Sequence, residues 1–125
     1  MNKFLKVMFI LLIIAMGSAA ILQLFFPELM GSNSEYGTSI GWQREIAFWN
    51  LAILPILISI NLKYDWFYLR VVLISLIIAG LGLGTNHLLG FIDDNSKIVS
   101  LIGALENYAL VVCWGIGWKI EKNKQ

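Results

Sequence analysis

The chain has 125 residues, of which 58% are hydrophobic and only 14% are charged. Soluble domains carry about a quarter charged residues, so this composition favours a protein whose solvent is lipid. The net charge of +1 lacks the basic surface that nucleic-acid binding needs, and we expect no nucleic-acid partner. Four spans of about 20 residues leave no room for a soluble domain, so we expect residues 1–125 to form a single integral membrane domain.

Four apolar segments follow one another, at about residues 4–26, 42–62, 66–89 and 98–118. The first follows Lys3 and Lys6 and contains small residues at 17–20, a pattern that a cleaved signal sequence shares. Because its apolar run continues to Phe26 and reaches spanning length, we expect it to be retained. The second contains Pro55, which a membrane helix tolerates when neighbours satisfy the freed carbonyl.

Polar segments separate the apolar ones: a loop at 28–40, a tight hinge at 63–65, a loop at 90–97 and a charged tail at 119–125. In lipid every backbone polar group needs an internal partner, and the runs are too long for barrel strands. The short connections favour an all-α, four-helix transmembrane bundle with up-down-up-down topology.

Lys and Arg residues predict the orientation of the bundle. With a cytoplasmic N-terminus, seven of the nine fall on the inner side, and only Arg44 and Lys97 fall on the outer side. We therefore expect both the N-terminus and the C-terminus to be cytoplasmic, in a multi-pass protein of the cell membrane.

Ionisable and amide side chains at membrane depth are costly and often functional. They concentrate in the half of the spans that we predict to be outer. The candidate binding residues are Arg44, Glu45, Asn50, Asn86, His87, Glu106 and Asn107.

Helical periodicity places several of these residues relative to small ones. His87 shares a face with Gly80 and Gly84, a small-xxx-small pair that allows close helix contact. Glu106 shares a face with Gly103, Ala109, Cys113 and Gly117, so we expect it to point into the bundle. Gln43 and Asn50, seven residues apart, should form one polar stripe. Trp49, Tyr108 and Trp114 are interpreted as packing residues.

A lone carboxylate at the depth of Glu106 would take up a proton unless it were paired. We expect Arg44 to pair with Glu106, and Glu45 to pair with His87 or Asn86. The alternatives are that Arg44, Glu45 and His87 are interfacial residues, and that Glu106 is a structural clamp between helices.

No catalytic arrangement is visible, so catalytic residues stay unknown and a non-enzymatic role is favoured. One histidine and one cysteine give no metal-ligand spacing, and no motif requires a cofactor; we expect neither a metal nor a cofactor. Cys113 lies in an apolar segment, where a free cysteine acts as a small packing residue.

The stretch 41–52 contains Trp42-Gln43-Arg44-Glu45, followed by Asn50-Leu51-Ala52. It resembles the second-helix signature, aromatic-x-x-Glu and then Asn-Leu-Ala, of a bacterial family of small four-helix membrane proteins of unknown function. Gly84-Thr85-Asn86-His87 and Asn107 fit the same family, and the resemblance covers about residues 40–118. The layout is also similar to DoxX-like proteins, in architecture only. The resemblance implies a bacterial inner-membrane protein with an outer polar cluster, and no established activity.

Three functions stay open. The polar cluster could bind or move a small solute, a lipid headgroup or a proton. The protein could instead be a non-catalytic partner subunit that stabilises or regulates a larger membrane complex, with the polar cluster only holding the bundle together. A channel or transporter with four helices per copy would need a homodimer. By analogy with some DoxX-like proteins alone, it could serve a redox or quinone-linked enzyme.

Overall fold

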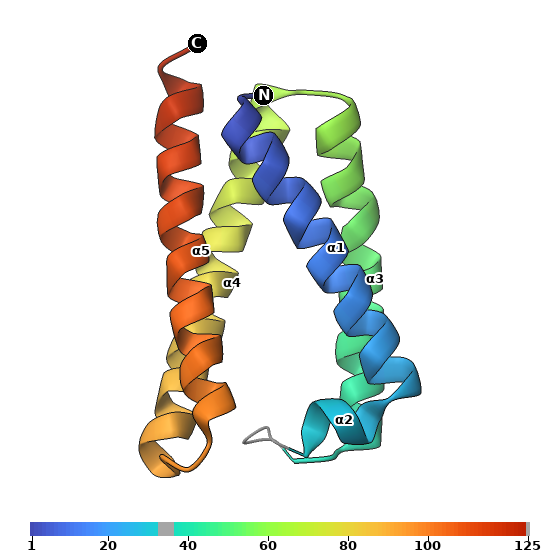
Figure 1. Ribbon diagram of the computed structural model, residues 1–125. Coiled ribbons are helices and arrows are strands. Elements are labelled where there is room, and N and C mark those ends of the chain that lie inside the picture. Colours follow the sequence, from blue (N-terminus) through green and yellow to red (C-terminus); the bar gives the residue numbers. More distant parts are fainter. Residues whose placement is uncertain (33–36, 125) are drawn as a thin grey trace. The chain divides into compact units, whose positions relative to one another are not determined.

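The protein is described by a computed structural model, which places residues 1–32 and 37–124. This part of the chain contains five helices and no strand (Figure 1). The helices are α1 (Lys3–Phe25), α2 (Pro27–Gly31), α3 (Ile40–Leu62), α4 (Trp66–Asp93) and α5 (Ile98–Lys122). All except α2 are long and apolar enough to cross a membrane. The prediction of an all-helical fold is therefore confirmed for the described residues, together with four helices that have the length and composition of membrane spans.

The helices extend beyond the apolar runs that predicted them. α4 continues to Asp93 and α5 to Lys122, so the predicted loop at 90–97 is reduced to residues 94–97, and the predicted tail begins later. Polar residues end a hydrophobic run, but they do not by themselves end a helix, because the backbone hydrogen bonds continue until a cap or turn intervenes. Hydropathy therefore gave the apolar part of each helix rather than its full length.

The predicted loop at 28–40 contains most of the short helix α2, which the hydropathy pattern does not indicate. Pro27 occupies its first turn, where proline fits because its missing N–H would have no helical partner. A Cβ atom added to Gly31 would lie 2.7 Å from the carbonyl oxygen of Gly37 and from the Cα of Thr38. Only a glycine therefore allows the chain to pass this closely. Residues 33–36 of the predicted loop lie outside the described part.

The two tighter connections are organised by aspartates. Asp65 accepts hydrogen bonds from the backbone N–H groups of Phe67 and Tyr68, at 2.9 and 3.1 Å, and so caps the start of α4. Asp94 accepts hydrogen bonds from the Ser96 hydroxyl and backbone N–H, at 2.6 and 3.1 Å. The Ser96 hydroxyl, and then its backbone N–H, lower the pKa of the exposed Asp94 carboxyl. Asp65 therefore determines where α4 begins, and the Asp94–Ser96 bonds shape the connection between α4 and α5.

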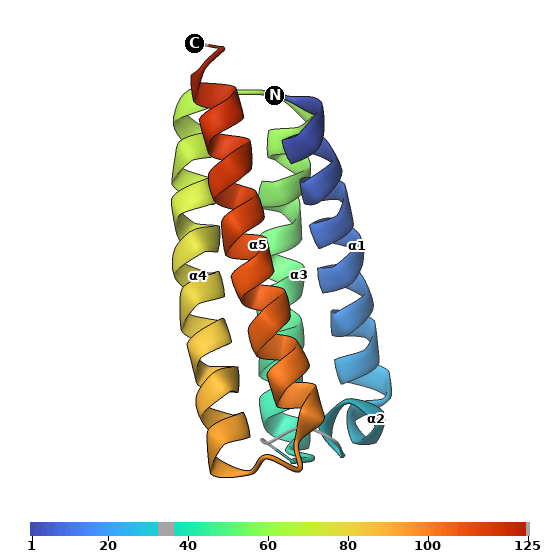
Figure 2. The ribbon, with the colours of Figure 1, turned by 60° about the vertical axis from the view of Figure 1, so that its left-hand side comes forward.

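The chain divides into two compact units. One comprises Met1–Leu5 and Asp65–Gln125, called here the α4–α5 unit; the other comprises Lys6–Tyr64, called the α1–α3 unit. α4 and α5 lie side by side in both ribbon views (Figure 1, Figure 2). In the α1–α3 unit, α1 lies close to α3 at Gly17. A Cβ atom added to Gly17 would lie 3.9 Å from Cδ1 of Leu54 in α3. The prediction that all 125 residues form a single domain stays a prediction.

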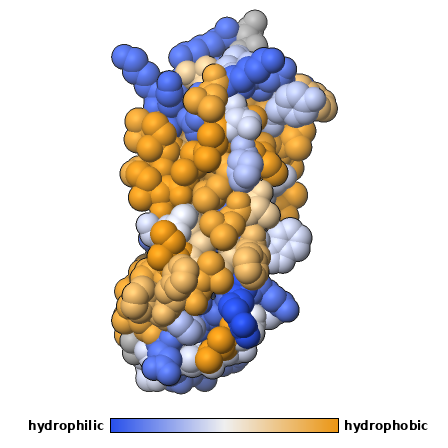
Figure 3. Space-filling model, turned by 90° about the vertical axis from the view of Figure 1, so that its right-hand side faces the viewer, coloured by the Kyte–Doolittle hydropathy of each residue, from blue (hydrophilic) through white to orange (hydrophobic). Residues whose placement is uncertain are grey.

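The surface has the polarity that a membrane span requires. In the face drawn in Figure 3, hydrophobic residues fill most of the middle, and hydrophilic residues gather towards the two ends. Many large apolar side chains on the four long helices are exposed, including Leu11, Ile14, Ile78 and Val112. Exposed patches of this extent mark a membrane or a partner, and the length of the helices favours a membrane.

Candidate functional site

The contact between α4 and α5 is formed by the glycines that the sequence singled out. Gly80 and Gly84 are both buried. A Cβ atom at position 80 would lie 2.7 Å from Cγ2 of Val111, and one at position 84 would lie 3.0 Å from Cε1 of Tyr108. The small-xxx-small pair is therefore a helix–helix contact, as predicted.

His87 lies on the same contact. A Cβ atom added to Gly103 of α5 would be 3.0 Å from the Cδ2 atom of the His87 ring, and His87 is half-buried. The predicted inward direction of His87 is therefore confirmed within the α4–α5 unit. The ring fits because Gly103 has no side chain, so this pair of residues determines how closely the C-terminal part of α4 and the N-terminal part of α5 approach.

Two further polar groups of α5 belong to the same contact. The Asn107 side-chain amide donates a hydrogen bond to the carbonyl oxygen of Gly103 at 2.8 Å, and its Cβ would be 3.2 Å from a Cβ at position 84. The hydroxyl groups of Tyr108 and Thr85 lie 3.0 Å apart and share a hydrogen bond between the helices. Asn107 and Tyr108 therefore contribute to packing between α4 and α5.

Glu106 differs from the prediction. Its side chain is exposed, and among the described residues of its own unit it forms no hydrogen bond or ion pair. The small residues predicted to share its helical face differ in burial: Gly117 is buried, Gly103 and Cys113 are half-buried, and Ala109 is exposed. The expectation that this stripe is wholly interior was wrong. The small residues were a valid sign of close packing, but the contact lies on the side of Gly103 and Asn107, and Glu106 points away from it.

The polar stripe on α3 is confirmed and faces the preceding helices. The buried Gln43 amide donates a hydrogen bond to the Pro27 carbonyl oxygen at 2.7 Å. Two helical turns further along α3, the half-buried Asn50 amide donates a hydrogen bond to the side-chain oxygen of Gln23 at 3.2 Å. Gln23 was missed by the sequence analysis, although a lone glutamine within an apolar run is itself a sign of an interhelical hydrogen bond.

The remaining candidates lie on the surface. Arg44, Glu45 and Asn86 are exposed. Arg44 and Glu45 belong to the α1–α3 unit, whereas Asn86, His87 and Glu106 belong to the α4–α5 unit. The pairs Arg44–Glu106 and Glu45–His87 (or Asn86) would join the two units, and they stay predictions.

Two of the aromatic residues that we interpreted as packing residues differ in how much of the side chain is exposed. Trp114 is 2% exposed and confirms the interpretation, whereas Trp49 is 70% exposed and contradicts it. Trp49 lines an open hollow of about 370 Å³ on α3, together with Glu45, Phe48 and Ala52. Helical periodicity accounts for this grouping, because the four positions are spaced at i, i+3, i+4 and i+7.

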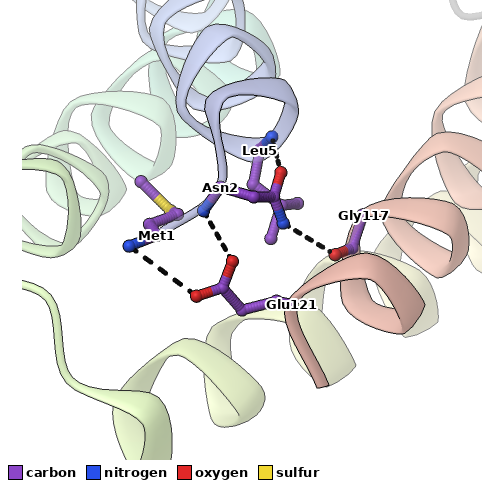
Figure 4. A network of polar contacts seen from close by, with 5 residues as sticks. All are labelled: Met1, Asn2, Leu5, Gly117 and Glu121. Atoms are coloured by element: carbon purple, nitrogen blue, oxygen red, sulfur yellow. Dashed lines mark hydrogen bonds and ion pairs between the residues drawn. The ribbon is translucent and has the colours of Figure 1, made fainter. Parts of the chain in front are cut away.

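A polar network at the other end of α5 was not predicted (Figure 4). The Asn2 side-chain oxygen accepts the Leu5 N–H at 2.8 Å and so caps α1, while its amide donates to the Gly117 carbonyl oxygen at 3.0 Å. The Asn2 N–H donates to the Glu121 carboxylate at 2.5 Å, and the Met1 amino group lies 3.7 Å from that carboxylate. An asparagine directly before an apolar run is a helix-start signal that could have identified Asn2.

Glu121 belongs to the predicted charged tail at 119–125, yet it is only 3% exposed. Gly117, one turn earlier, makes room for this arrangement, because a Cβ atom there would collide with the Leu5 side chain. The network therefore attaches the first five residues to the last turns of α5. It is a structural feature at the end of α5 that we predict to be cytoplasmic, fifteen residues after Glu106 along the chain.

In residues 1–32 and 37–124, no three His, Cys, Asp or Glu side chains are grouped as a metal site. No family model, no curated protein and no solved structure matches this chain. The resemblance to a bacterial four-helix family therefore stays a prediction, and the residues themselves carry the functional argument.

Proposed function

We propose that this multi-pass membrane protein binds a small polar solute or protons at ionisable groups in the outer half of its spans. The observation that carries the proposal is the exposed carboxyl group of Glu106. It lies eight residues after the start of α5, which at 1.5 Å per residue corresponds to a depth of roughly 12 Å. An ionisable group at such a depth that forms no hydrogen bond or ion pair within the α4–α5 unit is a functional candidate.

The position of Glu106 beside the polar contact between α4 and α5 supports this proposal. His87 and Asn107 lie against Gly103 and Gly84 in the contact between the two helices, and Glu106 directly precedes Asn107, so a rigid contact holds the backbone that carries the carboxyl group. Rigid elements position a binding group more precisely than loops do. In this arrangement Glu106 is the group that exchanges protons or contacts the solute, while His87 and Asn107 position the helices.

The topology supports an outer location for the site. With both termini cytoplasmic, α3 and α5 start at the outer surface and α4 ends there. Arg44, Glu45, Asn86, His87 and Glu106 then fall in the outer half. Protein in the cell membrane would thus expose the site to the outside medium, from which a solute or proton would enter.

The proposal is tested by carbodiimide labelling of Glu106 in membranes, measured by mass spectrometry across pH. A carbodiimide reacts with protonated carboxyl groups in apolar surroundings, so labelling of Glu106 should rise as the pH falls and be absent in Glu106→Gln. Glu28→Gln is the matched control, because Glu28 lies in α2 outside the four spans, and this substitution should leave the labelling unchanged. Absence of labelling at every pH would contradict the proposal.

One observation favours the alternative of a partner subunit. Gly82 of α4 and Gly115 of α5 are exposed, and a Cβ atom at either position would meet no other atom within 4 Å. Small residues on open membrane surfaces allow another helix to approach closely. A second copy of the chain, or a different membrane protein, would then cover these positions.

Native mass spectrometry of the purified protein separates the two functions. A homodimer that is lost in Gly82→Leu or Gly115→Leu, combined with unreactive Glu106, would favour the subunit role. A monomer with reactive Glu106 would favour binding.

A further inference from the structure

The hollow on α3 has the composition of a binding site for an organic cation. It is lined by Glu45, Phe48, Trp49 and Ala52, and the two aromatic side chains are 61% and 70% exposed. Aromatic faces attract cations, and a carboxylate accepts strong hydrogen bonds from ammonium groups. Within the α1–α3 unit, Glu45 forms no hydrogen bond or ion pair with the described residues, and its side chain lines the hollow.

A group of opposite charge lies directly beside this hollow. Arg44 precedes Glu45 on the same helix and is also exposed. Adjacent residues on a helix diverge by about 100° and do not pair with each other. The surface of the α1–α3 unit therefore offers a cation and an anion next to each other. This is the charge pattern that complements a zwitterion.

The depth of the hollow fits the headgroup region of a bilayer. Arg44 and Glu45 lie four and five residues after the start of α3, at roughly 6 and 7.5 Å along the helix. Further along the same face, Ala52 and Ile56 follow Phe48 at intervals of four residues and are exposed. Charges near the helix end thus continue into an apolar stripe that could lie along an acyl chain.

We propose that this face of α3 binds a zwitterionic phospholipid with a primary ammonium headgroup, of the phosphatidylethanolamine type. The ammonium group contacts Glu45 and the Trp49 ring, the phosphate contacts Arg44, and an acyl chain lies along Phe48, Ala52 and Ile56. Three N–H donors favour a primary ammonium over a quaternary one at a carboxylate. The inference goes beyond the proposed function, because it uses α3 alone and does not need Glu106.

The test is native mass spectrometry of the detergent-purified protein titrated with phosphatidylethanolamine, phosphatidylcholine or phosphatidylglycerol. The wild type should bind phosphatidylethanolamine most tightly. Glu45→Gln should weaken that binding about tenfold, as expected for the loss of a charge-assisted hydrogen bond, and leave phosphatidylglycerol unaffected. Arg44→Gln should weaken all three lipids, because each carries a phosphate.

Matched controls are Glu28→Gln and Arg70→Gln, which remove the same charges elsewhere and should leave the lipid preference unchanged. Circular dichroism confirms that each variant is folded, and Phe48→Leu provides a second, uncharged change within the hollow that should also reduce binding. Equal binding of phosphatidylethanolamine and phosphatidylglycerol by the wild type would overturn the inference, as would an unaltered preference in Glu45→Gln. A dimer that binds no lipid would show that a second copy covers the face.

The same samples separate this inference from the proposed function. Glu106→Gln should retain the preference for phosphatidylethanolamine even though it abolishes carbodiimide labelling. Loss of labelling at Glu106 in the wild type would contradict only the proposed function, and loss of the preference for phosphatidylethanolamine would contradict only the lipid site on α3.

Discussion

At the scale of single residues, the polar groups divide by what they contact. His87, Asn107 and Asn50 are half-buried and contact a neighbouring helix. Arg44, Glu45 and Glu106 are exposed. The first group stabilises helix contacts, and the second is left to interact with lipid, solute or another protein surface. The division explains why the charged residues, rather than the amides, carry both functional proposals.

Asn2 is the residue whose replacement should disturb stability most specifically. Asn2→Ala removes the cap of α1 and the bond to the Gly117 carbonyl oxygen. We expect the free energy of unfolding to fall by about 1–2 kcal/mol, from a lost cap and a lost buried hydrogen bond. Thermal unfolding in detergent measures this change. The control Asn95→Ala, at an exposed position, should change stability little, and an equal effect of both would contradict the assignment.

At the scale of elements, the contact between α4 and α5 depends on the absence of side chains at particular positions. Gly80 and Gly84 lie on one face and are buried, whereas Gly82, between them, is exposed. The spacing of the small residues suggested this face, and the structure shows which residues of α5 fill it. The part near the C-terminal end of α4 is filled by Tyr108, Asn107 and His87.

The two glycines, Gly80 and Gly82, provide a matched test. Gly80→Ala places a Cβ atom 2.7 Å from Cγ2 of Val111, which forces the helices apart and should cost about 1–3 kcal/mol. Gly82→Ala meets no atom within 4 Å and should be neutral or slightly stabilising, because alanine favours helix. Unfolding in detergent at increasing denaturant concentration compares them. If Gly82→Ala were the more damaging change, the described contact would be incorrect.

At the scale of the whole molecule, the orientation in the membrane and the contact between the two units are predictions from the sequence. The excess of Lys and Arg on one side predicts cytoplasmic termini. The charges of Arg44 and Glu106, one in each unit, predict an ion pair between the units, which is the alternative to the solute-binding and lipid-binding roles proposed for these two side chains. The first prediction concerns how the chain lies in the bilayer, and the second concerns how its two units contact each other. Each has its own test.

The orientation is tested by cysteine accessibility in a Cys113→Ala background. Lys97→Cys should react with a membrane-impermeant maleimide in intact cells, whereas Lys124→Cys should react only after lysis. Lys97 lies between α4 and α5, and Lys124 follows α5, so the two positions report opposite sides of the last span. The reverse pattern would invert the predicted topology and place the candidate site at the cytoplasmic face.

The predicted ion pair is tested by a double-mutant cycle of Arg44→Ala and Glu106→Ala, with unfolding measured in detergent. A direct pair should give a coupling energy of about 0.5–3 kcal/mol. Arg70→Ala, combined with Glu106→Ala, is the control and should be additive. Additivity of Arg44→Ala with Glu106→Ala as well would exclude the pair and leave each charge exposed to other partners.

The sequence by itself determined the four apolar helices, because a chain in lipid must satisfy its backbone polar groups within each span, and this requirement depends only on local length and hydropathy. It also predicted the shared face of Gly80, Gly84 and His87 from helical periodicity. Only the tertiary structure decided that Glu106 points away from the α4–α5 contact, and that Asn2 is tied to Glu121. The rotation of a helix about its axis depends on the side chains of its neighbour, and no pattern within one segment contains that information.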